Sequence, residues 1–421
     1  MPESSREVTR SDMGDARAQF AATRALSVAL VEPLSEADAS IQSMEDASPA
    51  KWHLAHTTWF WETFLLRDGD AKYRLFNEKY PFLFNSYYES EGIRMARDAR
   101  GMLSRPSLAE VLEWRAHVDQ AMEPLLNDPR HADLIALGVA HEQQHIELLL
   151  TDIKHALFQN PLGPAMWDGA PTAADAAGEL GWHNHPGGIA LIGHDGAGFA
   201  FDNEGPRHRV LLEPFALADR LVTNSEWDAF ITDDGYDTAS LWLADGWAWV
   251  RESGITAPHY WRGDEHFTHQ GWRVRDPNAP VTHISQYEAD AFATWAGARL
   301  PTEFEWEAVA RGQREDAASP AHPSDSGNQL DGAGAPQPLG GTDLFGDVWQ
   351  FTRSAYLPYP RFKAPEGAVG EYNGKFMSGQ GVLKGASCAS VRGHSRASYR
   401  NFFYPHQRWQ FTGLRLARDE A

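Results

Sequence analysis

Cysteine is almost absent from this sequence. Cys388 is the only one in 421 residues, so the chain cannot form an internal disulfide, and we expect Cys388 to be an inert core residue. Long apolar runs and a signal peptide are also missing, which argues against membrane-spanning helices and predicts a cytoplasmic protein. Basic residues are few: 37 Lys and Arg against 58 Asp and Glu give a formal net charge of −21. With no compensating basic tract, nucleic acid and anionic membranes are poor partners.

The composition is that of a globular protein, with 42% hydrophobic and 12% aromatic residues, and the length predicts two or three domains. Residues 1–158 carry four amphipathic helical patterns, which predict a four-helix bundle. These patterns cover 15–34, 49–66, 107–126 and 134–158. Residues 159–186 are rich in Pro, Gly and Ala and predict a linker. From 187 to 421 short apolar runs alternate with turn residues, so the predicted fold class is α+β with several domains.

Short elements are expected in the second half. Apolar runs at 189–193, 209–212 and 215–218 predict strands, and residues 313–342 are expected to be an irregular loop. Helices are predicted at 223–233 with Asn224 as the cap, at 285–298 with Ser285 as the cap and Glu288 completing a capping box, and at 306–311. In the first half, Ser48 is the predicted cap of the helix that begins at Pro49.

The segment His141-Glu142-Gln143-Gln144-His145 is the strongest chemical signal. On a helix, His141 and His145 lie on one face, one turn apart, which lets two imidazoles bind one metal ion. The Glu after the first His also matches the zinc-protease pattern H-E-x-x-H, in which Glu142 would act as general base. A coincidental histidine pair is the plain alternative, so a third ligand is needed to decide.

A third histidine is available on the helix predicted at 49–66. His56 shares the apolar face of this helix, and His53 lies about 60° around it, because three residues turn a helix by roughly 300°. An inward histidine needs a ligand or a hydrogen bond, since a buried unpaired polar group is costly. Three imidazoles from two helices would form a site suited to Fe(II), Zn(II), Cu(II) or Ni(II). His183 and His185 are weaker candidates, because a Gly/Pro-rich loop holds ligands poorly.

Two further features lie between these helices. The connector FNSYYESEG at 84–92 is long and aromatic, and long loops in compact domains tend to be functional; alternatively, Tyr87 and Tyr88 only attach the loop to the bundle. An arginine cluster follows, unusual in so acidic a chain, and it is either solvated or receives a substrate carboxylate. Its members are Arg94, Arg97, Arg100 and Arg105.

Four ordered motifs make the second half resemble the formylglycine-generating enzyme domain, which has a C-type-lectin-like fold. The motifs are LPTEFEWE at 300–307, LFGDVWQFT at 344–352, VLKGAS at 382–387, and YRN at 399–401 with FTGLR at 411–415. Formylglycine generation depends on a cysteine pair, so the single Cys388 disfavours that activity. The first half resembles the DinB-like bundle, in which three histidines bind a divalent metal.

Together the two halves resemble the ergothioneine-biosynthesis sulfoxide synthases, which are non-haem iron enzymes. These join hercynine (Nα-trimethylhistidine) to a thiol, with O2 as co-substrate, through a carbon–sulfur bond and a sulfoxide. The stretches SPAKWHLAHTTWFWETFLL, FNSYYESEG and HEQQHIELLL are similar to the type II subgroup. The resemblance implies that His56, His141 and His145 bind Fe(II), because the family's third ligand sits in the LAH triplet and not at His53. It also implies that Tyr87 or Tyr88 is catalytic.

The resemblance extends to substrate contacts. Gln144 falls where the family contacts the hercynine imidazole, and Asn401 falls where an Asn approaches the betaine end. Aromatic faces suit quaternary ammonium ions, so Phe402, Phe403 and Tyr404 are expected to surround the betaine. Arg94 or Arg97 is expected to bind the carboxylate of the thiol substrate.

The identity of the thiol depends on a departure from the family pattern. Members that use γ-glutamylcysteine carry an Asp and an Arg shortly after the Asn, whereas this chain has Phe403 and Gln407 there, which favours free cysteine. The predicted product is hercynylcysteine sulfoxide. Alternatives are synthases that use γ-glutamylcysteine, a selenosugar (for selenoneine) or histidine (for ovothiol). A DinB-like zinc thiol transferase would need no O2, but a simple transferase has no need of the long formylglycine-type domain. The three histidines and the FNSYY loop argue against a non-catalytic display or binding module.

Overall fold

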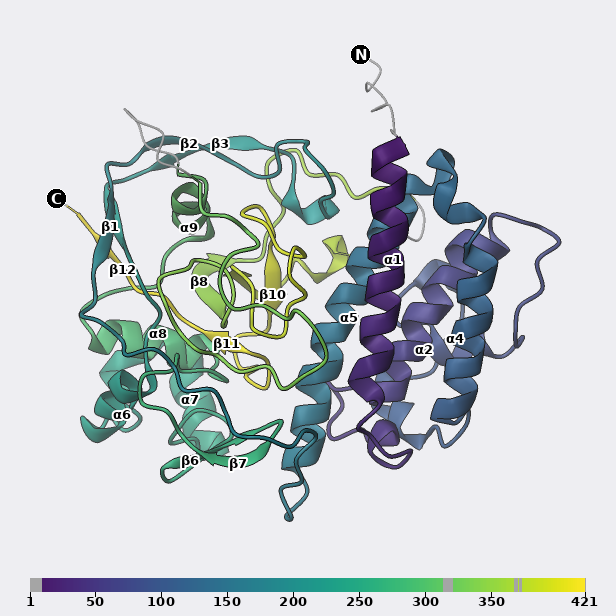
Figure 1. Ribbon diagram of the computed structural model, residues 1–421. Helices are drawn as coiled ribbons and strands as arrows, with labels where there is room; N and C mark the ends of the chain where they lie inside the picture. The colour runs from purple at the N-terminus through teal and green to yellow at the C-terminus, as the bar shows by residue number, and fades with distance from the viewer. Residues whose placement is uncertain (1–9, 313–320, 367–369, 371–372, 421) are drawn as a thin grey trace. The chain divides into compact units, whose positions relative to one another are not determined.

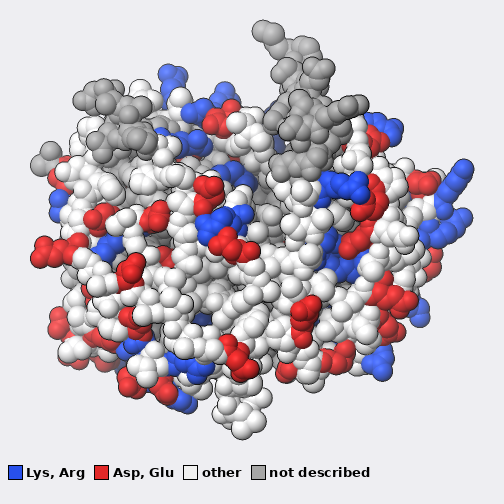
Figure 2. Space-filling view, in the orientation of Figure 1, with Lys and Arg blue, Asp and Glu red and all other residues white. Residues whose placement is uncertain are grey.

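The computed structural model describes residues 10–312, 321–366, 370 and 373–420. It divides into two compact units: Met1–Gln159 with Gly332–Gly334, and Asn160–Asp331 with Ala335–Ala421 (Figure 1). Helices dominate the first unit, and short strands and helices make up the second, so the α+β class is confirmed. Lys and Arg are scattered among Asp and Glu on the face drawn in Figure 2.

Four long helices build the first unit, as the apolar periodicity predicts. They are α1 (Arg10–Val31), α2 (Ala50–Trp61), α4 (Leu108–Met122) and α5 (Ala132–Phe158). Helix α2 packs against both α4 and α5, and α1 packs against α5. A π-helical turn at Glu62–Arg67 continues α2, and the short helix α3 (Tyr80–Phe84) lies in the aromatic connector. Helix α4 starts at a capping box between Ser107 and Glu110.

The start of α2 differs from the prediction. Pro49 is the N-cap, and no side chain caps the helix, so Ser48 does not have the predicted role. Its backbone N–H instead donates to Asp152 Oδ2 at 2.8 Å, and its hydroxyl accepts from Arg100 Nη1 at 2.9 Å. The serine is therefore used to join three segments of the unit, which a local sequence pattern does not reveal.

Twelve short strands lie in the second unit among the described residues. They are β1 (Trp182–His185), β2 (Gly188–Ile192), β3 (His208–Leu212), β4 (Phe215–Ala218), β5 (Trp261–Arg262), β6 (Glu265–Thr268), β7 (Gly271–Val274), β8 (Trp349–Ala355), β9 (Gly381–Lys384), β10 (Asn401–Phe403), β11 (Thr412–Gly413) and β12 (Ala417–Asp419). They form sheets in the orders β1-β4-β12, β10-β9-β8-β11, β2-β3 and β5-β6-β7. All pairs are antiparallel except β11 with β8.

Helices α6 (Asn224–Thr232), α7 (Ala244–Ser253), α8 (Gln286–Trp295) and α9 (Glu303–Ala310) complete this unit. The box of Ser285 and Glu288 is confirmed, but Thr223 and not Asn224 caps α6, because the Thr hydroxyl accepts from the N–H of Glu226. Two expectations were incomplete: strand β1 lies inside the segment predicted as linker, and α7 was not predicted. The predicted loop at 313–342 has no helix or strand in its described part, and residues 313–320 lie outside the described residues.

The core of the second unit is apolar but encloses paired charges. Trp306, Phe345 and Leu217 are fully buried in its main cluster. Glu303 binds Arg400 at 2.7 Å, and Glu307 binds Lys384 at 3.2 Å, with all four side chains buried. Each carboxylate keeps a basic partner, as burial of a charge demands.

Candidate metal centre

Three buried histidines converge inside the helical unit. His56 comes from α2, and His141 and His145 come from successive turns of α5. Each offers a nitrogen ligand, and the three atoms lie within 4.8 Å of one another. The ring centroids are 4.7 to 5.0 Å apart. This is the only group of its kind among the described residues, and neither His183 nor His185 belongs to one.

The surroundings of His56 leave one nitrogen available for a ligand. Its ring lies between the indoles of Trp52 and Trp59, nearly parallel to both, at 4.7 and 5.4 Å between centroids. Its Nδ1–H donates to the carbonyl of Phe84 at 2.6 Å, so Nε2 carries the lone pair. That Nε2 is buried and has no hydrogen-bond partner among the described residues. A buried bare imidazole nitrogen fits a metal ligand, since it would otherwise be costly.

Burial keeps all three imidazoles neutral. It lowers the pKa of His141 to about 3. Burial, and secondly the repulsion that a protonated His141 would exert, lower the pKa of His56 and of His145 well below the usual value. Neutral imidazole is the form that binds a metal, so the site is ready for a cation at neutral pH without first losing protons. Three such nitrogens suit iron, and equally zinc, copper or nickel.

The zinc-protease interpretation of Glu142 is wrong. The carboxylate lies in a buried network, where it accepts hydrogen bonds from Arg24 at 3.0 Å, Ser27 at 2.7 Å, Trp61 at 3.0 Å and Arg115. Burial alone would raise the pKa of Glu142, but the charges of Arg115 and Arg24 outweigh it and hold this pKa well below its usual value. A carboxylate with four donors has no free lone pair directed at a substrate, so it cannot serve as general base.

The tyrosine pair lies close to the centre. Tyr88 is fully buried, and its ring is 5.4 Å from that of Trp59, which itself stacks on His56. Tyr87 stacks on Tyr88 at 5.0 Å between centroids and is partly exposed. The FNSYY loop therefore contacts the aromatic shell of His56 through Tyr88.

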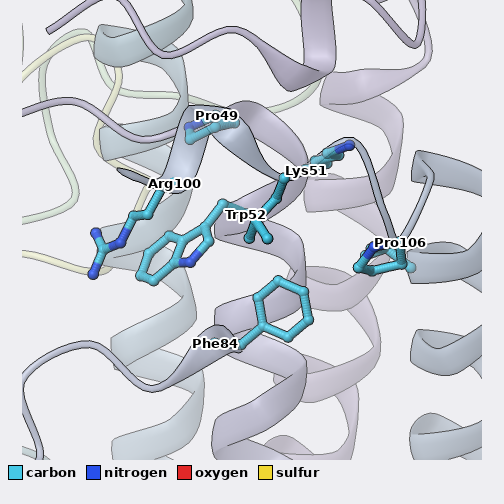
Figure 3. Close-up of a pocket in the computed structure, with 8 residues that line it drawn as sticks. Pro49, Lys51, Trp52, Phe84, Arg100 and Pro106 are labelled. Carbon is cyan, nitrogen blue, oxygen red and sulfur yellow. The ribbon is translucent and has the colours of Figure 1, made fainter. Parts of the chain in front are cut away.

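The arginines of the cluster have different surroundings. Arg94 pairs with Glu89 at 2.6 Å, and Arg97 donates to the backbone carbonyl of Asp46. Arg100 is buried, and its guanidinium lies 3.5 Å from the Trp52 ring centroid (Figure 3). It hydrogen-bonds only hydroxyls, those of Ser48 and Ser86, among the described residues. Burial and the charge of Arg97 lower the pKa of Arg100 to about 9, so it remains cationic at pH 7.

The other expected substrate contacts are divided between the units. Gln144 is half-buried on α5, one residue before His145. In the second unit, Asn401, Phe402 and Phe403 form β10, and Phe402 stacks on Tyr356 at 4.1 Å between centroids. Tyr404 is 45% exposed. Cys388 is buried, as expected.

The sequence analysis did not identify the buried charged residues that hydrogen-bond Glu142 and His53 next to this site. Arg24, Arg115 and Asp152 are all buried inside the bundle. A signal was present, because Arg115 occupies a position in the apolar repeat of α4 together with Val111 and Val118. A charged residue on a buried helix face requires a buried partner.

Comparison with known proteins agrees with both halves. Residues 19–149 match the DinB superfamily, and residues 184–420 match the sulfatase-modifying factor enzyme 1-like domain. A hercynine oxygenase of Mycolicibacterium thermoresistibile is 35% identical over 417 residues, which cover 91% of this chain and 90% of that protein. One of Mycolicibacterium smegmatis is 32% identical, covering 98% of this chain and 100% of that protein. A formylglycine-generating enzyme of Thermomonospora curvata is 36% identical but covers only 32% of this chain and 50% of that protein.

No helix among the described residues is both long and apolar enough to cross a membrane. The similarity to these two relatives extends over both domains, which a single shared domain would not produce. The chain is an oxidoreductase and belongs to the hercynine oxygenase family.

Proposed function

We propose that this enzyme couples hercynine to cysteine with O2, using Fe(II) held by His56, His141 and His145, and releases hercynylcysteine sulfoxide for ergothioneine biosynthesis. The observation that carries the proposal is the buried cluster of three neutral imidazoles, one with a bare Nε2. Support comes from relatives named hercynine oxygenase, whose similarity extends over nearly the whole chain. When bound, the iron supplies activation of O2 toward the thiol.

The proposed reaction balances without a further reductant. The imidazole C–H and the thiol S–H together lose two hydrogens, and a C–S bond forms between the two substrates. One oxygen atom of O2 ends on sulfur as the sulfoxide, and the other leaves as water with the two hydrogens. The substrates lose four electrons in total, and O2 gains four.

Each proposed protein role has its own chemical reason. Tyr87 or Tyr88 supplies a proton or hydrogen atom that turns the reaction from oxidation of the thiol sulfur toward attack on the imidazole carbon. Gln144 is proposed to hydrogen-bond the hercynine imidazole, and Asn401 to approach its betaine end. The aromatic rings of Phe402, Phe403 and Tyr404 are proposed to surround the trimethylammonium group, which aromatic faces attract.

The thiol substrate requires a cation for its carboxylate. Arg94 and Arg97 remain candidates, and Arg100 joins them because, among the described residues, it is buried with no acidic side chain within hydrogen-bond distance. A substrate carboxylate would supply the anion that this buried guanidinium lacks, in the bidentate geometry that arginine favours.

The test is to load the protein anaerobically with Fe(II), add hercynine and cysteine, admit air, and identify products by mass spectrometry. The expected product is hercynylcysteine sulfoxide, and it should be absent when Zn(II) replaces Fe(II). Parallel reactions with γ-glutamylcysteine, a selenosugar, or histidine in place of hercynine determine the natural pair. If no coupled product forms with any pair while one zinc per chain co-purifies, the thiol-transferase alternative replaces this proposal.

Two single variants separate the tyrosine roles. Tyr87→Phe and Tyr88→Phe each remove one hydroxyl and keep the ring that packs on Trp59 or on its neighbour. The variant at the catalytic position should lose coupled product and gain cysteine sulfinic acid, whereas the other should retain the wild-type product ratio. Unchanged product ratios in both variants would remove the FNSYY loop from the chemistry.

A further inference from the structure

Two of the three proposed metal ligands, His56 and His145, hydrogen-bond different kinds of group through Nδ1. His56 donates to a backbone carbonyl, that of Phe84. The Nδ1 of His145 instead lies 2.9 Å from the Nδ1 of a fourth buried histidine, His53, and the Nε2 of His53 lies 3.1 Å from Asp152 Oδ2. We propose that Asp152 and His53 form a positioning relay that sets the tautomer of His145 and so directs its Nε2 lone pair at the metal. This inference rests on the proposed metal centre.

The relay begins at Asp152 Oδ2, which is a hydrogen-bond acceptor. Asp152 Oδ2 accepts the backbone N–H of Ser48 at 2.8 Å, and a backbone N–H can only donate. The same oxygen faces His53 Nε2, so His53 Nε2 must be the protonated nitrogen of that contact. In neutral His53 the other nitrogen, Nδ1, is then a hydrogen-bond acceptor.

The acceptor on His53 determines the state of His145. Because His53 Nδ1 accepts, the contact at 2.9 Å requires His145 Nδ1 to carry its proton and donate. The Nε2 of His145 is consequently bare and available to the metal. The opposite tautomer of His53 would reverse every step and place a proton on His145 Nε2, where it would block a cation. Metal-binding histidines commonly have their second nitrogen fixed in this way.

Burial makes the relay a stable arrangement. His53 and Asp152 are each only 3% exposed, so water does not compete for these hydrogen bonds. His53 lies one turn before His56 on α2, and Asp152 lies two turns after His145 on α5, so the relay also joins the two helices that carry the ligands. The acceptor for His56 is a backbone carbonyl, which no substitution removes. The acceptor for His145 is the side chain of His53, which a substitution can remove.

The experiment measures metal affinity and ligand geometry separately from activity. Co(II) is titrated anaerobically into the full-length protein against a chelator of known affinity, and its visible absorption spectrum is recorded at saturation. His53→Phe removes both relay contacts, and we expect about 10- to 100-fold weaker binding with an altered spectrum. His53→Asn places an amide oxygen where Nδ1 was, so it should accept from His145 and recover most of the affinity.

A matched control lies on the same helix as His145. His155 is buried, contacts Ser43 at 2.7 Å through its Nδ1, and is not part of the three-histidine group. His155→Phe therefore removes a comparable contact from α5 and should leave Co(II) affinity and spectrum unchanged. A second variant pair acts through the carboxylate: Asp152→Asn keeps an oxygen facing Ser48 and His53, whereas Asp152→Leu does not and should resemble His53→Phe.

The outcomes separate the relay from the metal centre. Wild-type affinity and spectrum in both His53→Phe and Asp152→Leu would overturn the relay and leave the metal centre intact. Equal losses in His53→Asn and His53→Phe would also overturn it, because the acceptor would then be irrelevant. Failure of wild type to bind Co(II), or equal binding by His56→Gln, would refute the metal centre itself. Melting temperatures of the metal-free variants confirm that each is folded.

Discussion

The buried position of Glu142 makes a strong prediction about stability. Glu142→Gln removes a charge that faces Arg115, a residue that is only 1% exposed. The other acceptors of Arg115 are neutral: the carbonyl of Arg24 at 3.1 Å and the hydroxyls of Ser27 and Thr57 at 2.6 and 3.4 Å. Arg24 is better provided for, because it keeps Asp119 at 2.6 Å. The variant therefore leaves the buried Arg115 guanidinium without a directly paired carboxylate.

The expected cost follows from that count. Breaking a buried pair by removing one partner costs about 3–5 kcal/mol, because the remaining charge stays desolvated. We expect Glu142→Gln to lose about this much free energy of unfolding in urea denaturation followed by tryptophan fluorescence. Glu113→Gln on α4 is the control: Glu113 is exposed, and its change should stay within about 0.5 kcal/mol. Adding Arg115→Met to Glu142→Gln should cost less than the sum of the single changes.

The pH dependence gives a second check. The pKa of Glu142 is held below its usual value in the folded protein, so its ionised form contributes stability above the unfolded pKa of about 4.3. That contribution is lost as the pH falls through the folded pKa. The gap between wild type and Glu142→Gln should thus be constant from about pH 8 to 5 and shrink in stronger acid. A variant as stable as wild type, but catalytically dead, would refute this reasoning and revive the general-base role.

Three further outcomes are expected. Gly138→Ala should destabilise the protein by about 1–3 kcal/mol in the same urea assay, despite a helix-propensity gain of about 1 kcal/mol, because the new Cβ would lie 2.5 Å from the Trp61 ring. Burial lowers the pKa of His394 to about 3, so below about pH 6.5 the unfolded chain binds a proton at this residue that the folded protein does not. The free energy of unfolding therefore decreases as the pH is lowered from about 6.5 toward 3, and His394→Phe should reduce this slope by about 1.4 kcal/mol per pH unit. Fe(II) at 100 times its Kd should add about 2.7 kcal/mol to the free energy of unfolding of the wild type and so raise its melting temperature. A chelator should reverse this increase, and His56→Gln should respond to neither Fe(II) nor the chelator.

Local patterns in the sequence determined much of this protein. The period of 3.6 residues located the four bundle helices, and the spacing of His141 and His145 by itself placed both on one face of α5. Capping chemistry predicted Ser285 with Glu288, since a cap depends on a few adjacent residues. The same local logic failed where distant residues competed. Ser48 is taken by Arg100 and Asp152, so it does not cap α2.

Contacts between distant residues were decided only by the tertiary structure. The sequence offered His53 and His56 as alternatives from one helix, but α5 had to pack against α2 before one could face His141 and the other Asp152. The role of Glu142 was equally hidden, because Arg24 and Arg115 lie 118 and 27 residues away along the chain. Spacing on a helix sets which side chains share a face. The partner that each face meets depends on packing, which joins residues far apart in sequence.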